Sequence, residues 1–292
     1  MDQIVSFTKT SGAGNDFVLI DNMNEKIQGD KAKLAIALCS RHFGVGADGL
    51  ILLEPSSKAD FLMRYYNADG SYGGMCGNGG RCAARFALLG GIAEPSMTFE
   101  ALDHIYRAEV VEHGVRLHMK DPSDFRTNLQ VNARGVTYDF TSINTGSPHI
   151  VIFANKLEDT DVRTVGRALR EHRSFSPEGA NVNFVKVLGK RDLQIRTYER
   201  GVEAETMACG TGTVAAAIVS YLLRHTKPPI TVRVTSGEHV TVDFEFEGDT
   251  ITHVVLEGSA HMLFSGQALY DMENQRSRTI AAPIPAPFTP LS

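Results

Sequence analysis

Apolar and polar residues alternate along most of this chain with the period of two that is typical of half-buried strands. Residues 5–21 predict strand, turn and strand, with the turn at SGAGND. The same alternation predicts further strands in both halves, over residues 50–54, 61–66, 97–101, 105–111, 114–119, 150–153, 183–188, 194–198, 230–236, 240–248 and 251–260. The pattern therefore predicts a sheet-rich protein.

Helical spacing of apolar residues occurs in few places. Asp30–Cys39 and Asp161–Glu171 predict short helices, and Asp30 is a plausible N-cap. Two longer Ala-rich helices are expected directly after the glycine turns that follow Cys76 and Cys209. Each half thus has a short helix, many strands and one helix that begins at a glycine turn. This favours an α+β fold, with a mixed, barrel-like sheet around the glycine-capped helix, over a parallel dinucleotide-binding sheet, whose GxGxxG signature is missing.

The two halves repeat each other. Gly14 recurs as Gly146, the tripeptide at 46–48 recurs at 179–181, and Cys76 recurs as Cys209, at offsets of 132, 133 and 133. Matches in the same order at a nearly constant offset indicate a domain duplication, because solenoid repeats are only about 20–50 residues long.

Length and charge limit the class of protein. A chain of 292 residues suits two domains, and a net charge of −5 without a basic run gives no nucleic-acid footprint. The longest apolar stretch, residues 213–223, is too short to span a bilayer, and the N-terminus lacks a signal-peptide pattern. Four cysteines suit a reducing compartment, so we expect a cytoplasmic protein.

Cys76 and Cys209 are the candidates for chemistry. Each lies among glycines at the start of a predicted helix, where backbone N–H groups and the helix dipole favour an anion. A thiol in such a place has a lowered pKa and can act as a base or nucleophile. Two of them in duplicated settings suggest an acid and a base on opposite faces of one carbon.

Other uses of the cysteines are possible on sequence alone. Cys39 and Cys82 lie within helical apolar patterns and suit packing. Cys76 and Cys82 are spaced CxxxxxC, with neither a CxxC nor a HExxH motif, so we expect no metal. A thiol–disulfide redox protein stays an alternative.

Several long motifs, in order, resemble the diaminopimelate epimerase family over about residues 5–270. They are GAGNDFVLID (12–21), RHFGVGADGL (41–50), YYNADGS with MCGNGGRC (65–82), TGSPHIV (145–151), GANVNFV (179–185) and YERGVEAETMACGTGT (198–213). The resemblance implies two similar domains with the active site in the interdomain cleft. We expect an N-terminal lobe at 1–121 that takes back a strand at about 262–271, a C-terminal lobe at 122–261, and a Pro-rich, extended or disordered tail at 272–292. It also implies a homodimer, with Tyr270 near the interface.

The activity implied is a cofactor-independent epimerisation of LL- to meso-diaminopimelate, a precursor of lysine and peptidoglycan. The resemblance assigns thiolate and thiol roles to Cys76 and Cys209 and makes His149 and Glu199 groups that tune them. It implies no pyridoxal phosphate, and we expect no metal, no nucleic acid and no membrane as a partner of this site. The residues that bind substrate in this pattern are Asn15, Asn67, Gly77, Asn78, Asn181, Glu199, Arg200, Gly210 and Thr211.

Structural readings of these residues compete with the functional ones. His149 also suits a hydrogen-bonded structural histidine, Arg200 a surface ion pair, and the asparagines turn formation. Two positions depart from the family pattern, with Ser147 and Gly49 where many members carry an amide, and both bear on specificity rather than on reaction type. A proline or hydroxyproline racemase-like enzyme is the nearest alternative, although that group typically has His in place of Asn78.

Overall fold

The computed structural model describes residues 2–248 and 250–280, and the chain divides into two compact units. The first unit comprises Met1–Leu117 with Ser259–Ser292, and the second comprises His118–Gly258. The sequence had suggested boundaries after residues 121 and 261. Each unit is described by itself below.

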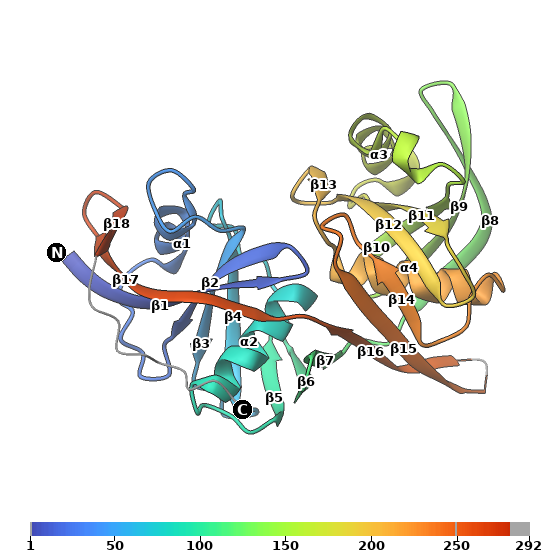
Figure 1. Ribbon diagram of the computed structural model, residues 1–292. Helices are drawn as coiled ribbons and strands as arrows, with labels where there is room; N and C mark the ends of the chain where they lie inside the picture. The colour runs from blue at the N-terminus through green and yellow to red at the C-terminus, as the bar shows by residue number, and fades with distance from the viewer. Residues whose placement is uncertain (1, 249, 281–292) are drawn as a thin grey trace. The chain divides into compact units, whose positions relative to one another are not determined.

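In the first unit the strands pair in the order β18–β17–β1–β2–β3–β4–β5–β6–β7 (Figure 1). Two neighbouring pairs, β2–β3 and β4–β5, are parallel, and a helix connects each of them, as a parallel crossover requires. The elements are β1 Asp2–Gly12, β2 Asn15–Asp21, α1 Lys31–Cys39, β3 Gly49–Glu54, β4 Phe61–Asn67, α2 Gly77–Leu89, β5 Ser96–Ala101, β6 His104–Val111, β7 Gly114–His118, β17 His261–Asp271 and β18 Arg276–Ile280.

The second unit repeats this plan, with the strand order β8–β9–β10–β11–β12–β14–β15–β16. Its parallel pairs are β10–β11 and β12–β14, again connected through helices. The elements are β8 Ser123–Ala133, β9 Val136–Asn144, β10 Pro148–Phe153, η1 Leu157–Asp159, α3 Val162–Arg170, η2 Arg173–Phe175, β11 Asn181–Val187, β12 Asp192–Glu199, β13 Ala204–Thr206, α4 Gly210–Leu222, β14 Ile230–Arg233, β15 His239–Glu247 and β16 Thr250–Gly258.

The matching strand orders confirm the duplication. The helices correspond as well, with α1 to α3 and α2 to α4. In the second unit β8 lies antiparallel to β9, whereas in the first unit the C-terminal strand β17 lies antiparallel to β1 in the corresponding place. The first unit therefore completes its sheet with a strand from the far end of the chain.

A central helix packs against most strands of the sheet in each unit. Helix α2 contacts β1, β2, β3, β4, β6 and β17, and α4 contacts strands from β9 to β16 in its own unit. Most side chains of both helices are small, and most are buried. Small residues let the sheet approach the helix from several directions, which explains the Ala-rich pattern seen in the sequence.

Both short helices begin at a capping aspartate, of which the sequence analysis predicted Asp30. Asp30 accepts hydrogen bonds from the amides of Ala32 and Lys33 at the start of α1, and Asp161 accepts one from Thr164 at the start of α3.

Two features differ from the sequence prediction. Strands β8 and β9 lie in a region for which no strand was predicted, because the side chains of β8 are mostly exposed and show little alternation. The tail does not begin at residue 272, because the chain turns after Asp271, whose carboxylate accepts from the amides of Glu273 and Asn274, and returns as β18 beside β17. The Pro-rich part of the expected tail, residues 281–292, lies outside the described residues.

Tyr270 lies on β17 and is buried in its own unit. Its side chain is 2% exposed and belongs to a cluster with Val5, Ile20 and Leu34. The residue that the family pattern associates with a dimer interface is therefore part of the core of the first unit.

Candidate active site

Both cysteines are the N-caps of the central helices. Cys76 precedes α2 with φ −120° and ψ 122°, and Cys209 precedes α4 with φ −123° and ψ 110°. Neither sulfur caps its helix by a hydrogen bond, and neither first turn contains an acidic residue. The first-turn N–H groups and the positive end of each helix dipole are thus suited to an external anion such as a carboxylate.

In the first unit, two of the predicted asparagines lie beside the start of α2. The Asn78 side chain donates from Nδ2 to Asn15 Oδ1 at 2.6 Å and accepts at Oδ1 from Arg81 at 2.9 Å. Asn15 in turn donates to Asp48 Oδ2 at 3.0 Å. These bonds orient both amides, because each amide oxygen faces a donor and each nitrogen an acceptor.

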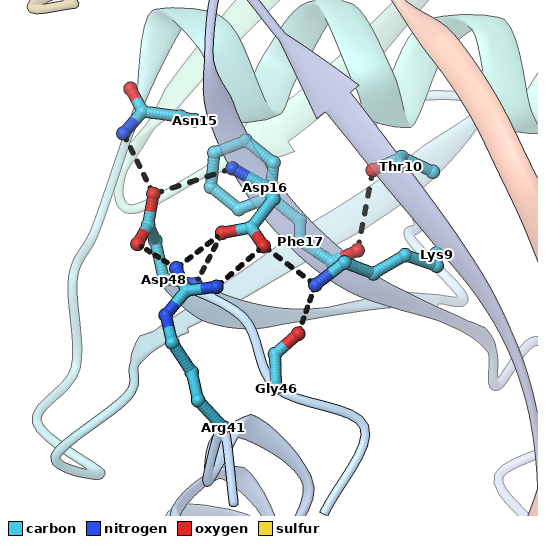
Figure 2. A network of polar contacts seen from close by, with 8 residues as sticks. All are labelled: Lys9, Thr10, Asn15, Asp16, Phe17, Arg41, Gly46 and Asp48. Atoms are coloured by element: carbon cyan, nitrogen blue, oxygen red, sulfur yellow. Dashed lines mark hydrogen bonds and ion pairs between the residues drawn. The ribbon is translucent and has the colours of Figure 1, made fainter. Parts of the chain in front are cut away.

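Asp48 continues into an ionic network around Asp16 (Figure 2). Arg41 donates to both oxygens of Asp16, at 3.0 and 2.8 Å, and to Asp48 at 2.7 Å. The buried ammonium of Lys9 donates to Asp16 at 2.7 Å and to the carbonyl of Gly46. Burial alone would raise the pKa of Asp16, but the hydrogen bonds from Arg41 and Lys9 outweigh it and lower that pKa. The network fixes the loop that carries Asp48 against Asn15.

The second unit builds the same arrangement from different side chains. Asn181 donates from Nδ2 to Ser147 Oγ at 3.1 Å, and Ser147 Oγ lies 3.4 Å from Thr211 Oγ1. By the repeat offsets, these three residues match Asp48, Asn15 and Asn78 of the first unit. The polar triplet beside each helix start is therefore duplicated, although every residue in it has changed.

A buried chain of hydrogen bonds determines the tautomer of His149. Thr197 donates to Asn183 Oδ1 at 3.0 Å, so Asn183 Nδ2 faces the carbonyl of Ile150 at 3.0 Å and His149 Nδ1 at 3.1 Å. Nδ1 must then accept, and the proton of the neutral ring lies on Nε2, which is 3.0 Å from Ser147 Oγ. His149 thus donates to Ser147.

The chain of hydrogen bonds continues from Ser147 toward the sulfur of Cys209. Ser147 Oγ receives N–H groups from His149 and Asn181, so its own hydrogen points at Thr211. The Thr211 hydroxyl lies 3.6 Å from Cys209 Sγ and is then oriented to donate to it. A hydroxyl donor stabilises a thiolate more than a thiol, so this chain favours the anionic form of Cys209.

His149 acts here as a neutral group. Burial, with a smaller contribution from the positive charge of Arg200, lowers the pKa of His149 to about 3. Its influence on a thiol at neutral pH therefore runs through hydrogen bonds rather than through a positive charge.

Glu199 ends β12 and Arg200 follows it. These two residues complete the predicted site residues of the second unit. Asn181 Oδ1 accepts from the Arg200 amide at 2.9 Å, and the Arg200 guanidinium lies 3.5 Å from the carbonyl of Glu178. Glu199 Oε2 accepts from Thr206 on β13 at 2.8 Å. Because both Nδ2 hydrogens of Asn181 are used, on Ser147 and on a main-chain carbonyl, the amide serves mainly to position Arg200.

The structure brings together Asn15 and Asn78 in one unit, and in the other His149, Asn181, Arg200, Thr211 and Cys209. Sequence reasoning missed several residues that hold them in place, among them Arg41, Asp48, Arg81, Asn183 and Thr197. The sequence repeat could have indicated Asp48, because this residue is the repeat partner of Asn181. For Arg41, Asn183 and Thr197 the contacts are with residues distant in sequence, and only the fold shows them.

Two searches of the described residues concern other classes of protein. They contain no group of three His, Cys, Asp or Glu side chains arranged to hold a metal ion. No helix in the described part of the chain has the length and apolarity to cross a membrane.

Comparison with known proteins shows the family. The family model described as diaminopimelate epimerase matches residues 7–123 and 141–263. A diaminopimelate epimerase of Chlorobaculum tepidum is 47% identical over 88% of this chain and 98% of its own, and one of Aquifex aeolicus is 42% identical over 90% and 97%.

Solved structures share the fold at low identity. A hydroxyproline epimerase from Agrobacterium vitis has a TM-score of 0.70 at 16% identity, covering 91% of this chain and 92% of its own. A Bacillus anthracis protein of the PhzF family has a TM-score of 0.69 at 15% identity, covering 91% and 99%. With two matched repeats, each starting its central helix at a cysteine, and with relatives this similar over nearly their whole length, the chain belongs to the diaminopimelate epimerase family.

Proposed function

We propose that this protein epimerises LL-diaminopimelate to meso-diaminopimelate without a cofactor, using Cys76 and Cys209 as a thiolate and thiol pair. Family membership supports the reaction. The observation that carries the assignment of residues is the duplicated helix start, where in both units a cysteine is the N-cap of the central helix and its side chain makes no capping hydrogen bond.

The chemistry requires two groups because an α-proton must leave one face of the carbon and another must arrive on the opposite face. The thiolate takes the α-proton, so the C–H bond breaks, an S–H bond forms and the electron pair moves into the substrate carboxylate. The opposite thiol then gives its proton to the other face and becomes the thiolate. Cysteine suits this exchange because its usual pKa, about 8.5, is close to neutrality.

The developing negative charge has to be stabilised on the substrate carboxylate. The main-chain N–H groups of Gly77 and Asn78 in α2, and of Gly210 and Thr211 in α4, are the proposed donors, supported by their places in the first turns. Arg200 supplies a planar cation suited to the distal carboxylate, with Asn15, Asn67, Asn181 and Glu199 around the remaining polar groups.

Deuterium exchange tests this proposal. Incubated with LL-diaminopimelate in D2O, the wild-type enzyme should label one α-carbon as the meso isomer forms, and Cys76→Ala and Cys209→Ala should each abolish turnover. Cys39→Ala is the matched control, because Cys39 is buried in α1 and burial raises the pKa of its thiol to about 12. Near-normal epimerisation by either of the first two variants would refute the two-base scheme.

A proline or hydroxyproline racemase-like activity is the competing proposal within the same fold. The fold alone supports it, because the matching structures are only 15–16% identical. Turnover of proline but not of diaminopimelate in a substrate panel would favour it. A homodimer and a cytoplasmic location stay predictions.

A further inference from the structure

The ring of Tyr65 on β4 is held in a slot between two glycines. A Cβ built at Gly73 would lie 2.4 Å from both Cδ1 and Cε1 of Tyr65, and one built at Gly49 would lie 2.4 Å from Cε2 on the other side of the ring and 2.5 Å from the main-chain oxygen of Tyr66. These distances are far below van der Waals contact, so any side chain at either position would collide with the ring. Tyr65 therefore occupies the space that residues 49 and 73 would otherwise use.

The ring has little freedom to leave this slot. Its side chain is 8% exposed, and it packs edge-on against Phe17 with the ring centroids 5.9 Å apart. Tyr65 thus brings its hydroxyl to one defined point.

That point is the side chain of Asn67, two residues further along. Tyr65 Oη donates to Asn67 Oδ1 at 2.8 Å, and Asn67 Nδ2 donates to Ser71 Oγ at 2.9 Å. The Ser71 hydroxyl itself donates to Asp69 Oδ1 at 2.5 Å, so it can only accept from Asn67. Both ends of the amide are therefore oriented, with oxygen toward Tyr65 and nitrogen toward Ser71.

We propose that Tyr65 is a positioning and specificity residue, which holds Asn67 as a hydrogen-bond donor for a carboxylate of the substrate. The inference rests on the proposed function, in which Asn67 contacts diaminopimelate. The amide nitrogen has two hydrogens and Ser71 accepts one, so the second suits an acceptor such as a carboxylate oxygen.

The Tyr65 ring and the main-chain oxygen of Tyr66 together exclude a side chain at position 49. Gly49 pairs with Asn67 across β3 and β4, so a side chain there would lie next to the proposed substrate contact. In this chain the Tyr65 ring takes that space and its hydroxyl supplies a polar group to the same asparagine.

The first experiment compares Tyr65→Phe with Tyr66→Phe, which removes the hydroxyl of the next residue on the same strand. Tyr65→Phe should raise KM for diaminopimelate about 3- to 10-fold, the usual effect of one lost hydrogen bond, with kcat within about 2-fold. Tyr66→Phe should leave both unchanged. An unchanged KM in Tyr65→Phe would overturn the positioning role.

The second experiment tests the slot without substrate. Gly73→Ala should lower the melting temperature, because its Cβ would meet the ring, and Gly73→Ala combined with Tyr65→Leu should recover most of that loss relative to Tyr65→Leu alone. A tolerated Gly73→Ala, or additive effects in the double variant, would overturn the inference. Because this readout needs no turnover, it separates a failure of the slot from a failure of the proposed activity, which inactive wild-type enzyme would reveal.

Discussion

Gly212 in α4 and Gly79 in α2 occupy the same place in the repeat but have different neighbours. A Cβ at Gly212 would lie 2.4 Å from Asn183 Oδ1 and 3.3 Å from Cys209 Sγ. A Cβ at Gly79 would lie 2.9 Å from Ile51 Cδ1 and 3.5 Å from Met63 Cε, which are the ends of flexible apolar side chains. Substitution by alanine is therefore expected to lower the stability of the two units by different amounts.

In Gly212→Ala the oxygen of Asn183 has to move by almost 1 Å, the shortfall from an ordinary contact of about 3.3 Å. Such a movement breaks the bond from Thr197 and disturbs those to His149 and Ile150. Each buried polar group left unsatisfied costs about 1–3 kcal/mol, and alanine recovers at most about 1 kcal/mol through helix propensity. We expect a net loss of roughly 2–4 kcal/mol in the second unit, against about 1 kcal/mol or less for Gly79→Ala.

Scanning calorimetry measures the difference. A loss of that size should lower the transition of the second unit by on the order of 10 °C, while Gly79→Ala should shift the first unit by only a few degrees. Turnover should fall in Gly212→Ala as well, since the new methyl group crowds the Cys209 sulfur. Equal shifts in the two variants would refute the reasoning, because they would show that the polar chain under Cys209 yields as easily as the apolar side chains under Cys76.

Two further predictions concern the same polar chain. The buried imidazole of His149 has a pKa of about 3 in the folded protein, below its usual 6.5. At a pH between these two values the imidazole is protonated in the unfolded chain but stays neutral in the folded protein. The free energy of unfolding should therefore fall as pH drops below about 6.5, by up to about 1.4 kcal/mol per pH unit. His149→Gln should flatten this dependence when urea unfolding is compared at pH 7 and pH 5. The same pH dependence in the variant and the wild type would contradict this prediction. Thr211→Val should slow alkylation of Cys209 by iodoacetamide at pH 7 about 10-fold, because the variant loses a donor to the thiolate. Thr211→Ser should keep the wild-type rate, and equal rates in the two variants would show that the hydroxyl has no effect.

The fold was predictable from the sequence wherever the pattern is local. The strands, the two capped short helices and the two cysteine helix starts all depend on residues that are neighbours along the chain. The duplication was visible because short motifs recur at an offset of 132–133. Strand β8 was missed because its exposed side chains show little alternation, and its role became clear only from its pairing with β9.

The amino-acid sequence by itself determined the family, the repeat and the two candidate thiols, since short motifs and their spacing carry that information. Tertiary structure alone decided the states of the surrounding groups. That His149 is neutral with its proton on Nε2, that Ser147 connects it toward Cys209, and that Tyr65 fills the space beside Gly49 all follow from contacts between separate strands. Protonation, hydrogen-bond direction and steric space depend on which groups are adjacent in three dimensions, and these neighbours come from segments far apart in the chain.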